Sequence, residues 1–582
     1  MPSVLDGRIE TTISNLSVTG GPLPLIDFAL PSGVKVPMIA AAPPTLVGYF
    51  AHFCAQHGDA EFLVDGDERL SFAQVHAKAT EVARVLVGGY GVSKGDRIGI
   101  AMRNAPSWVV LYMGILMAGG TATLLNGWWQ GGELCDGITD VGATLVFADP
   151  PRAKRVAECG RETGFEIVLV DVALPLDEAL QPVLARGGID AALPDVSPDD
   201  LATILFTSGS TGQSKGAYST HRAVVQGTFN YIAMALMMLQ IATEDGTIKE
   251  PRPQHAVLMT VPLFHVTGEI PMLLVSFAIG RKMVMMPKWN ALEAMRLIDA
   301  EQVTNFTGVP LMSWEILNHP ERANYNLSTV QSFAAGGAPR PPEHVRRLND
   351  EMPAPPALGY GLTETNAVGA GSFGDNYMQK PNSTGRASKP LVEIAILDDD
   401  GHPVPQGERG EISIRSVANF SGYWNRPEAT ASCMTADGFF RTGDVGYLDP
   451  DDYVFIVDRK KDIIIRGGEN ISCQEVEAAI YEHPAIAEAC VFGLPDDRLG
   501  EIVGAIAHVH PGEHLSDEAL LFFLSDRLAG FKVPARLWFE DAPLPKLGTE
   551  KIDKVGLRTR YRAVHAAEVK ERSEESRGGK EC

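Results

Sequence analysis

Residues 207–216 read TSGSTGQSKG and directly follow the apolar segment 201–206, LATILF. The apolar segment predicts a strand, and the glycines, hydroxyl residues and lysine after it predict a loop that offers N–H groups and a cation to a polyphosphate. It is not a Walker loop, because Ser214 replaces the required glycine and Gly216 the required hydroxyl residue. Taken alone, the run would also fit a flexible surface turn, so its interpretation depends on the rest of the chain.

Helical and strand patterns alternate on both sides of this loop. An amphipathic helix is predicted over 75–86, and buried strands over 97–102 and 144–148. The same alternation returns after the loop, with strands predicted over 256–260 and 281–286 and helices over 291–301 and 342–350. Alternating strands and helices are typical of parallel sheets covered on both faces, so we expect two successive α/β lobes.

The later part of the chain changes character. Short strand patterns at 392–397, 411–414 and 453–457 predict a small β sub-domain at about 392–457. After it, helices over 474–481 and 517–528 and strands over 487–492 and 503–509 predict an α+β unit. The expected fold class is α/β, and the predicted divisions are an extended arm (1–45), a large N-terminal domain (46–459), a small C-terminal domain (460–565) and a disordered tail (566–582).

Composition and charge limit the classes of function that the chain could have. A net charge of −23 over 582 residues argues against a nucleic-acid groove. The seven cysteines are scattered without a CxxC pair, which favours reduced thiols in a cytosol and no zinc site. Charged Asp6, Arg8 and Glu10 are atypical of a signal peptide, and the apolar stretch 270–280 is too short to span a bilayer. We therefore expect a cytoplasmic protein without a transmembrane segment, and leave a homodimer open.

Six further segments accompany the loop in a fixed order. They are PLFHVTG (262–268), GGAP (336–339), GYGLTET (359–365), RTGDVG (441–446), DRKKDIIIRGGENIS (458–472) and PKLGTEKIDK (545–554). Together with TSGSTGQSKG, this set resembles the adenylate-forming superfamily of acyl-CoA synthetases, peptide-synthetase adenylation domains and firefly luciferase, over roughly residues 45–565. The resemblance implies one cleft between a large body and a mobile C-terminal cap, in which ATP activates a carboxylic acid as an acyl-adenylate.

The resemblance also implies an ATP site and a magnesium ion as cofactor. The residues after 206 would close over the β- and γ-phosphates, Tyr360 would stack on adenine, Thr363 would bind a phosphate oxygen, and Glu364 would ligate Mg²⁺ together with Thr211. Asp444 would accept bonds from the ribose hydroxyls, with Arg459 beside it. The remaining predicted nucleotide-binding residues are Thr207, Ser208, Gly209, Ser210, Gly212, Lys215, Gly337, Ala338, Pro339, Gly359 and Gly361.

By the same resemblance, Lys551 is the catalytic lysine that bridges the acyl carboxylate and the α-phosphate. Glu550 precedes it where the family usually has glycine, which leaves the strength of that cation in question. Lys461 aligns with the hinge of the small domain. Since no carrier domain follows Lys551, free coenzyme A is the expected thiol, with Arg466, Gly467 and Gly468 flanking its pantetheine arm.

The acid is expected to be hydrophobic, and a fatty acid fits. Amino-acid-activating relatives carry an aspartate near PLFHVTG, whereas this chain has Phe264, His265 and Val266 there. His265 resembles the histidine between the acyl pocket and the thiol tunnel. The residues expected to line the acyl pocket are Phe306, Gly308, Val309, Gly336, Ala367 and Met234, the last on an apolar helix over 231–239 that also fits plain core packing.

Three hypotheses therefore remain open from the sequence. The first is an acid:CoA ligase, AMP-forming, whose acid could also be aromatic. The second is an acyl-AMP ligase that passes its product to a carrier protein. The third is a catalytically disabled protein that binds nucleotide or acyl groups.

Overall fold

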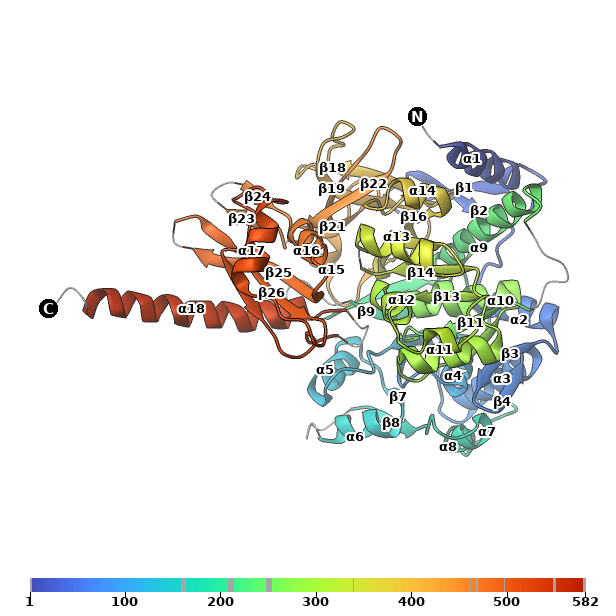
Figure 1. Ribbon diagram of the computed structural model, residues 1–582. Helices are drawn as coiled ribbons and strands as arrows, with labels where there is room; N and C mark the ends of the chain where they lie inside the picture. Colours follow the sequence, from blue (N-terminus) through green and yellow to red (C-terminus); the bar gives the residue numbers. More distant parts are fainter. Residues whose placement is uncertain are drawn as a thin grey trace. The chain divides into compact units, whose positions relative to one another are not determined.

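The computed structural model describes residues 3–158, 164–207, 214–247, 254–338, 340–460, 462–466, 469–496, 498–547 and 551–578 (Figure 1). The fold is α/β, with a large N-terminal domain and a small C-terminal domain, as the sequence predicts. The chain divides into two compact units. Unit 1 comprises Met1–Pro403, Ser413–Thr442 and Leu448–Val454; unit 2 comprises Val404–Ile412, Gly443–Tyr447 and Phe455–Cys582.

The first sheet of unit 1 has seven strands in the order β20-β10-β9-β6-β5-β7-β8. Neighbouring strands from β9 to β8 pair in parallel, which confirms the first α/β lobe. β9 and β10 are antiparallel, with Lys215 opposite Thr207, so the TSGSTGQSKG run connects two strands of a hairpin. The strands are β5 (Arg97–Ala101), β6 (Thr121–Leu124), β7 (Leu145–Ala148), β8 (Glu166–Leu169), β9 (Leu201–Thr207), β10 (Lys215–Thr220) and β20 (Gly422–Tyr423).

The second sheet has nine strands in the order β17-β16-β15-β14-β13-β11-β12-β3-β4. All neighbours from β15 to β3 pair in parallel, so these strands end at the same edge of the sheet. Two of these strands, β3 and β4, come from the chain segment of the first lobe. The sequence did not indicate that they would join the second sheet. The strands are β3 (Glu61–Asp65), β4 (Glu68–Ser71), β11 (Ala256–Met259), β12 (Lys282–Met285), β13 (Asn305–Gly308), β14 (Ser332–Gly336), β15 (Pro356–Gly361), β16 (Gly369–Phe373) and β17 (Arg386–Ala387).

Helices build two separate hydrophobic clusters beside these sheets. One cluster contains residues of α2 (Leu46–His57), α3 (Phe72–Gly88), α4 (Pro106–Met117), α9 (His221–Glu244), the π-helix η1 (Gly268–Leu274) and α10 (Val275–Ile279). The other contains residues of α11 (Ala291–Glu301), α12 (Pro310–Leu317) and α13 (Pro342–Glu351), which cover one face of the second sheet (Figure 1). Shorter helices of unit 1 are α5 (Gly131–Val141), α6 (Pro150–Glu158), α7 (Leu176–Ala179), α8 (Gln181–Leu184), η2 (Arg322–Asn324), η3 (Thr363–Thr365), α14 (Gly374–Gln379) and α15 (Pro427–Cys433).

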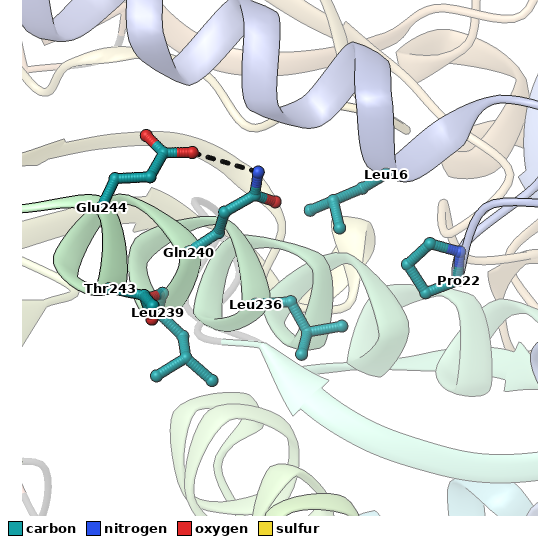
Figure 2. A pocket seen from close by; sticks show the side chains of 7 residues that line it. All are labelled: Leu16, Pro22, Leu236, Leu239, Gln240, Thr243 and Glu244. Atoms are coloured by element: carbon teal, nitrogen blue, oxygen red, sulfur yellow. Dashed lines mark hydrogen bonds between the residues drawn. The ribbon is translucent and has the colours of Figure 1, made fainter.

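Helix α9 is less completely buried than its apolar sequence predicts. Met238 and Leu239 are 37% and 41% exposed near its carboxyl end. By length and hydropathy α9 is the one helix in the described part of the chain that could cross a membrane, and 61% of its apolar window is buried, as in a core helix. Leu236 and Leu239 line a hollow of about 520 Å³ between α9 and the N-terminal helix, which Figure 2 shows. None of its lining residues is a predicted site residue.

The N-terminal segment is not the extended arm that the sequence predicts. It contains α1 (Val4–Ser17), which packs on α9, followed by the hairpin β1 (Leu25–Ala29) and β2 (Lys35–Ile39). Asp6, only 2% exposed, accepts hydrogen bonds from the Tyr453 hydroxyl (3.0 Å to Oδ1) and the Asn376 amide (3.0 Å). Polar contacts such as these help to hold the helix in place, so its sequence shows only weak apolar periodicity. For that reason the sequence pattern did not predict this helix.

The predicted mostly-β segment forms a four-stranded sheet in the order β18-β19-β21-β22. Its strands are β18 (Glu393–Leu397), β19 (Gly410–Arg415), β21 (Phe440–Leu448) and β22 (Val454–Arg459). Later strands form a sheet in the order β24-β23-β26-β25, with β27 parallel to β26. Its elements are β23 (Ile464–Arg466), β24 (Glu469–Ile471), α16 (Cys473–Tyr481), β25 (Ile486–Asp496), β26 (Gly500–Val509), α17 (Asp517–Ser525) and β27 (Arg536–Phe539).

Two further expectations differ from the structure. Helix α18 (Lys554–Gly578) runs through most of the predicted disordered tail, because strong helix formers such as Glu, Lys, Arg and Ala dominate its sequence. Cys135, buried on α5, is disulfide-bonded, whereas we expected reduced thiols throughout. Sequence spacing alone cannot reveal such a pairing. Cys54, Cys433, Cys473 and Cys490 form no disulfide bond with a described residue.

Candidate active site

The glycine-rich motifs meet at the carboxyl edge of the second sheet. Gly336, at the end of β14, lies opposite Gly359 of β15 in parallel register. Gly337 and Ala338 follow β14 directly, and Gly337 has a φ of 75°, which favours glycine. In parallel sheets this edge is where ligands bind, so the predicted adenine contacts are side by side. Pro339 lies outside the described residues.

The turn after β15 places Thr363 and Glu364. These residues form the short helix η3, and Asn366 and Ala367 after it both adopt left-handed backbone conformations, with φ of 47° and 65°. The Ala367 carbonyl accepts a hydrogen bond from the Tyr231 hydroxyl of α9 at 2.7 Å, which holds this strained turn. Glu364 is buried at 7% exposure, and Thr363 is half-buried.

Lys215 and Glu364 are linked through one aromatic residue that the sequence reasoning missed. The Tyr423 hydroxyl donates to Glu364 Oε1 at 2.6 Å, and Lys215 Nζ lies 4.9 Å from the centre of the Tyr423 ring. The available signal was the aromatic run GYW at 422–424, which sequence reasoning left without a role. Thr207 and Lys215 begin and end the described stem of the loop, and Ser208, Gly209, Ser210, Thr211 and Gly212 lie outside the described residues.

His265 lies in the turn between β11 and η1, beyond the same edge of the second sheet. Its side chain is half-buried, and its Nδ1 accepts a hydrogen bond from the Thr267 amide at 3.3 Å. Four residues later, Glu269 is fully buried, and Tyr112 donates to its Oε1 at 2.7 Å, while Oε2 has no hydrogen-bond partner among the described residues. Burial raises the pKa of the Glu269 carboxyl from 4.5 to about 7.

The predicted acyl-pocket residues come from different parts of the hydrophobic core. Phe306 and Val309 belong to the cluster under α11, α12 and α13, and a side chain at Gly308 would meet Met312 of α12 at 2.8 Å. Met234 instead lies on α9, with its methyl group 3.5 Å from the point where a side chain on Gly371 would begin. Ala367 joins the cluster that includes α9 residues, so the acyl assignment remains a prediction.

Three predicted residues come together in unit 2. Asp444 on β21 is buried and forms an ion pair with Arg459 of β22, with 3.2 Å between Oδ1 and Nε. Lys551 lies near both, since burial and the neighbouring Arg459 charge lower the pKa of its ammonium from 10.5 to about 8, while Asp444 acts in the opposite direction. The Lys551 carbonyl accepts a hydrogen bond from the Leu547 amide at 2.7 Å.

Other predicted residues of unit 2 can be located only in part. Arg466 ends β23, and its backbone pairs with Glu469 and Gly500. Lys461, Gly467, Gly468 and Glu550 lie outside the described residues. The hinge and pantetheine assignments therefore remain predictions.

The donor chemistry at Glu364 fits a magnesium ion. Mg²⁺ in nucleotide sites is usually held by one or two carboxylates together with phosphate oxygens. Glu364 supplies a buried carboxylate whose Oε1 is oriented by a neutral phenol, because burial and the Glu364 charge raise the pKa of Tyr423 far above its usual value. A carboxylate fixed in this way meets the requirement for a hard oxygen donor.

Comparison with known proteins agrees with this geometry. Residues 50–424 match the family of AMP-binding enzymes, and residues 475–551 match the C-terminal domain of AMP-binding enzymes. The chain is 32% identical over 535 residues to a 3-[(3aS,4S,7aS)-7a-methyl-1,5-dioxo-octahydro-1H-inden-4-yl]propanoyl:CoA ligase of Rhodococcus jostii, covering 89% of this chain and 98% of the relative. It is also 32% identical over 498 residues to the long-chain-fatty-acid–CoA ligase FadD13 of Mycobacterium tuberculosis, covering 86% and 94%.

One solved structure is similar to this chain over most of its length. It is the O-succinylbenzoate coenzyme A synthetase MenE of Bacillus subtilis in complex with ATP and a magnesium ion. Its TM-score is 0.73 at 26% identity, covering 88% of this chain and 99% of the MenE chain.

Proposed function

Because this chain belongs to the family of AMP-binding enzymes, in its acyl-CoA synthetase branch, we propose that it uses ATP to join a hydrophobic carboxylic acid to coenzyme A. The observation that carries the proposal is the shared sheet edge at which Gly336, Gly359 and Glu364 lie, in a chain whose relatives are CoA ligases.

The reaction has two displacement steps. In the first, a carboxylate oxygen of the acid forms a bond to the α-phosphorus of ATP, and the bond from that phosphorus to pyrophosphate breaks. In the second, the deprotonated thiolate sulfur of coenzyme A forms a bond to the acyl carbon, the bond from that carbon to the phosphate oxygen of AMP breaks, and AMP leaves with the electron pair. Both steps concentrate negative charge, so the enzyme must supply fixed cations and hydrogen-bond donors.

Residues of unit 1 supply the nucleotide contacts in this proposal. The backbone at Gly337 and Ala338 follows the adenine edge, and Tyr360 stacks on the base. Thr363, Lys215 and the loop after Thr207 bind the phosphates. The small residues at this edge support the assignment, because they let a nucleotide approach the backbone closely.

Residues of unit 2 supply the ribose contact and the catalytic cation. Asp444 is a buried carboxylate that suits a vicinal diol, and Arg459 holds it in place. Lys551 neutralises charge between the acid and the α-phosphate during the first step. Glu364 and Thr211 would hold Mg²⁺, which would neutralise phosphate charge and orient the leaving pyrophosphate when bound.

The acid is proposed to be a fatty or other hydrophobic acid. FadD13 is named for long-chain fatty acids, whereas MenE is named for an aromatic acid, so an aryl acid is the alternative. An amino-acid substrate finds no support, because Phe264, His265 and Val266 stand where amino-acid-activating relatives carry an aspartate. The cytoplasmic location and the homodimer remain predictions.

One assay separates the hypotheses. The protein is incubated with ATP, Mg²⁺, coenzyme A and acids of graded length and aromaticity, and acyl-AMP, acyl-CoA and pyrophosphate are measured. Acyl-CoA formation is expected with a hydrophobic acid. Accumulation of acyl-AMP without thioester would instead identify an acyl-AMP ligase, and no acid-dependent pyrophosphate exchange would identify a disabled binding protein.

A further inference from the structure

Tyr423 joins the two chain segments that carry the predicted phosphate cation and the predicted metal ligand. It lies on β20, which pairs antiparallel with β10 so that Tyr423 is opposite Ala217, two residues after Lys215. The same segment also reaches the Glu364 backbone, because the Phe420 amide donates to the Glu364 carbonyl at 2.8 Å. Backbone bonds on both sides therefore determine where the Tyr423 side chain begins.

The side chain itself is held in one orientation. The Tyr423 ring packs edge-to-face with the Phe420 ring, with ring centres 5.0 Å apart. The backbone amide of Tyr423 donates to the Thr430 hydroxyl of α15 at 2.9 Å. The hydroxyl reaches Glu364 Oε1, and the ring face carries the Lys215 ammonium. One rigid side chain thus contacts a cation through its face and an anion through its edge.

The contact with Tyr423 leaves the charge of Lys215 available to a ligand. In the described part of the chain Lys215 makes no ion pair, and its described partner is the Tyr423 ring. A cation over an aromatic face keeps much of its charge unneutralised, unlike a cation paired with a carboxylate. The hydrogen bond from the Tyr423 hydroxyl to Oε1 fixes the orientation of the Glu364 carboxylate.

We infer that Tyr423 is a positioning residue for adenylate formation, which orients Glu364 toward the metal and Lys215 toward the phosphates of ATP. The inference rests on the proposed function, since it assumes that ATP and a divalent cation bind at this edge. Tyr423 does not itself touch the reacting atoms. Its effect is transmitted through the two side chains that it holds.

Two variants separate the hydroxyl from the ring. Tyr423→Phe removes the bond to Glu364 and keeps the ring under Lys215, whereas Tyr423→Leu removes both. Tyr453→Phe is the matched control, because Tyr453 also donates to a buried carboxylate of unit 1, that of Asp6. Binding of ATP is measured by calorimetry with and without Mg²⁺, and adenylate formation is measured as pyrophosphate exchange over a range of Mg²⁺ concentrations.

Tyr423→Phe is expected to bind ATP in the absence of Mg²⁺ as tightly as the wild type does. The factor by which Mg²⁺ increases its ATP affinity should be about tenfold smaller than in the wild type. Tyr423→Leu is expected to weaken ATP binding in the absence of Mg²⁺ as well. In a Glu364→Gln background, Tyr423→Phe should cause no further loss, because it acts through that carboxylate. Tyr453→Phe should leave the Mg²⁺ dependence unchanged.

Equal Mg²⁺ enhancement in Tyr423→Phe and the wild type would overturn the inference, and so would fully additive losses in the double variant. A lowered melting temperature with unchanged Mg²⁺ dependence would assign Tyr423 a structural role and would also overturn it. Failure of the wild type to form an adenylate with any acid is a different result, which refutes the proposed function.

Discussion

Gly336 and Gly359 lie opposite each other in the parallel pairing of β14 and β15, which brings the GGAP and GYGLTET motifs together. The two strands have no side chains at this point, so the edge of the sheet presents bare backbone to a ligand. Neighbouring glycines serve different purposes, and substitution can distinguish them.

Gly361→Ala should destabilise the protein, because its methyl carbon would lie 2.1 Å from the Ala367 carbonyl oxygen. Overpacking of this kind costs about 1–3 kcal/mol and should lower the melting temperature. Gly359→Ala is the control, since no atom of the described residues lies within 4 Å of its added carbon. That variant should melt as the wild type does and bind ATP more weakly. Equal melting of both variants would contradict the prediction.

Lys551→Ala should slow adenylate formation by about 10²–10³-fold, and the variant should still convert supplied acyl-AMP and coenzyme A. In the wild type, kcat/KM for adenylation should fall as pH rises through about 8, because the ammonium has a pKa of about 8 and loses its proton there. Lys546→Ala is the control, since Lys546 is paired with Glu488 at 3.0 Å. Equal damage to both half-reactions by Lys551→Ala would refute the assigned role.

Relative to the wild type, Glu269→Gln should raise the stability of the protein more at high pH than at low pH. The folded-state pKa of Glu269 is about 7 and the unfolded value 4.5, so the folded state retains a proton that the unfolded state releases between those values. Wild-type stability is therefore lost as pH rises from 4.5 to 7, by roughly 3 kcal/mol, and the glutamine variant avoids this loss. The measurement is the difference in melting temperature between variant and wild type at pH 5 and pH 8. A difference that does not change with pH would count against it.

Asp6→Ala should loosen the N-terminal helix, because it leaves the buried Tyr453 hydroxyl and Asn376 amide without their acceptor. Such a loss costs about 1–3 kcal/mol and should appear as a lower unfolding midpoint and faster proteolysis within α1. Glu10→Ala on the same helix removes an exposed partner of Arg386 and should change little. Proteolysis at the wild-type rate in Asp6→Ala would show that α1 is held by other contacts.

The sequence predicted those elements whose local pattern agrees with their final environment. Helix α11 was predicted with the bounds 291–301 that the structure has, because its apolar residues repeat at helical spacing and Asn290 caps its start. The strands β5 and β7 were predicted within a residue, since each is a short apolar run. Local patterns of this kind were also sufficient to predict the two α/β lobes.

Features that depend on distant partners were missed. Helix α1 is fixed by Asp6 and residues beyond 370, and nothing near it in sequence indicates them. Tyr423 likewise has its role only because β20 pairs with β10. The family motifs led to the Asp444–Arg459 pair. They also grouped Phe306 with Met234 in one acyl pocket, whereas Phe306 packs in the cluster of α11, α12 and α13 and Met234 lies on α9 near Gly371.

The division of the chain has a consequence for engineering. The polypeptide passes between the two units after Pro403, Ile412, Thr442, Tyr447 and Val454. No truncation at a single codon can therefore release either unit whole. A chimera that exchanges unit 2 with that of a relative would need three donor fragments spliced in register, including the short one that carries Asp444.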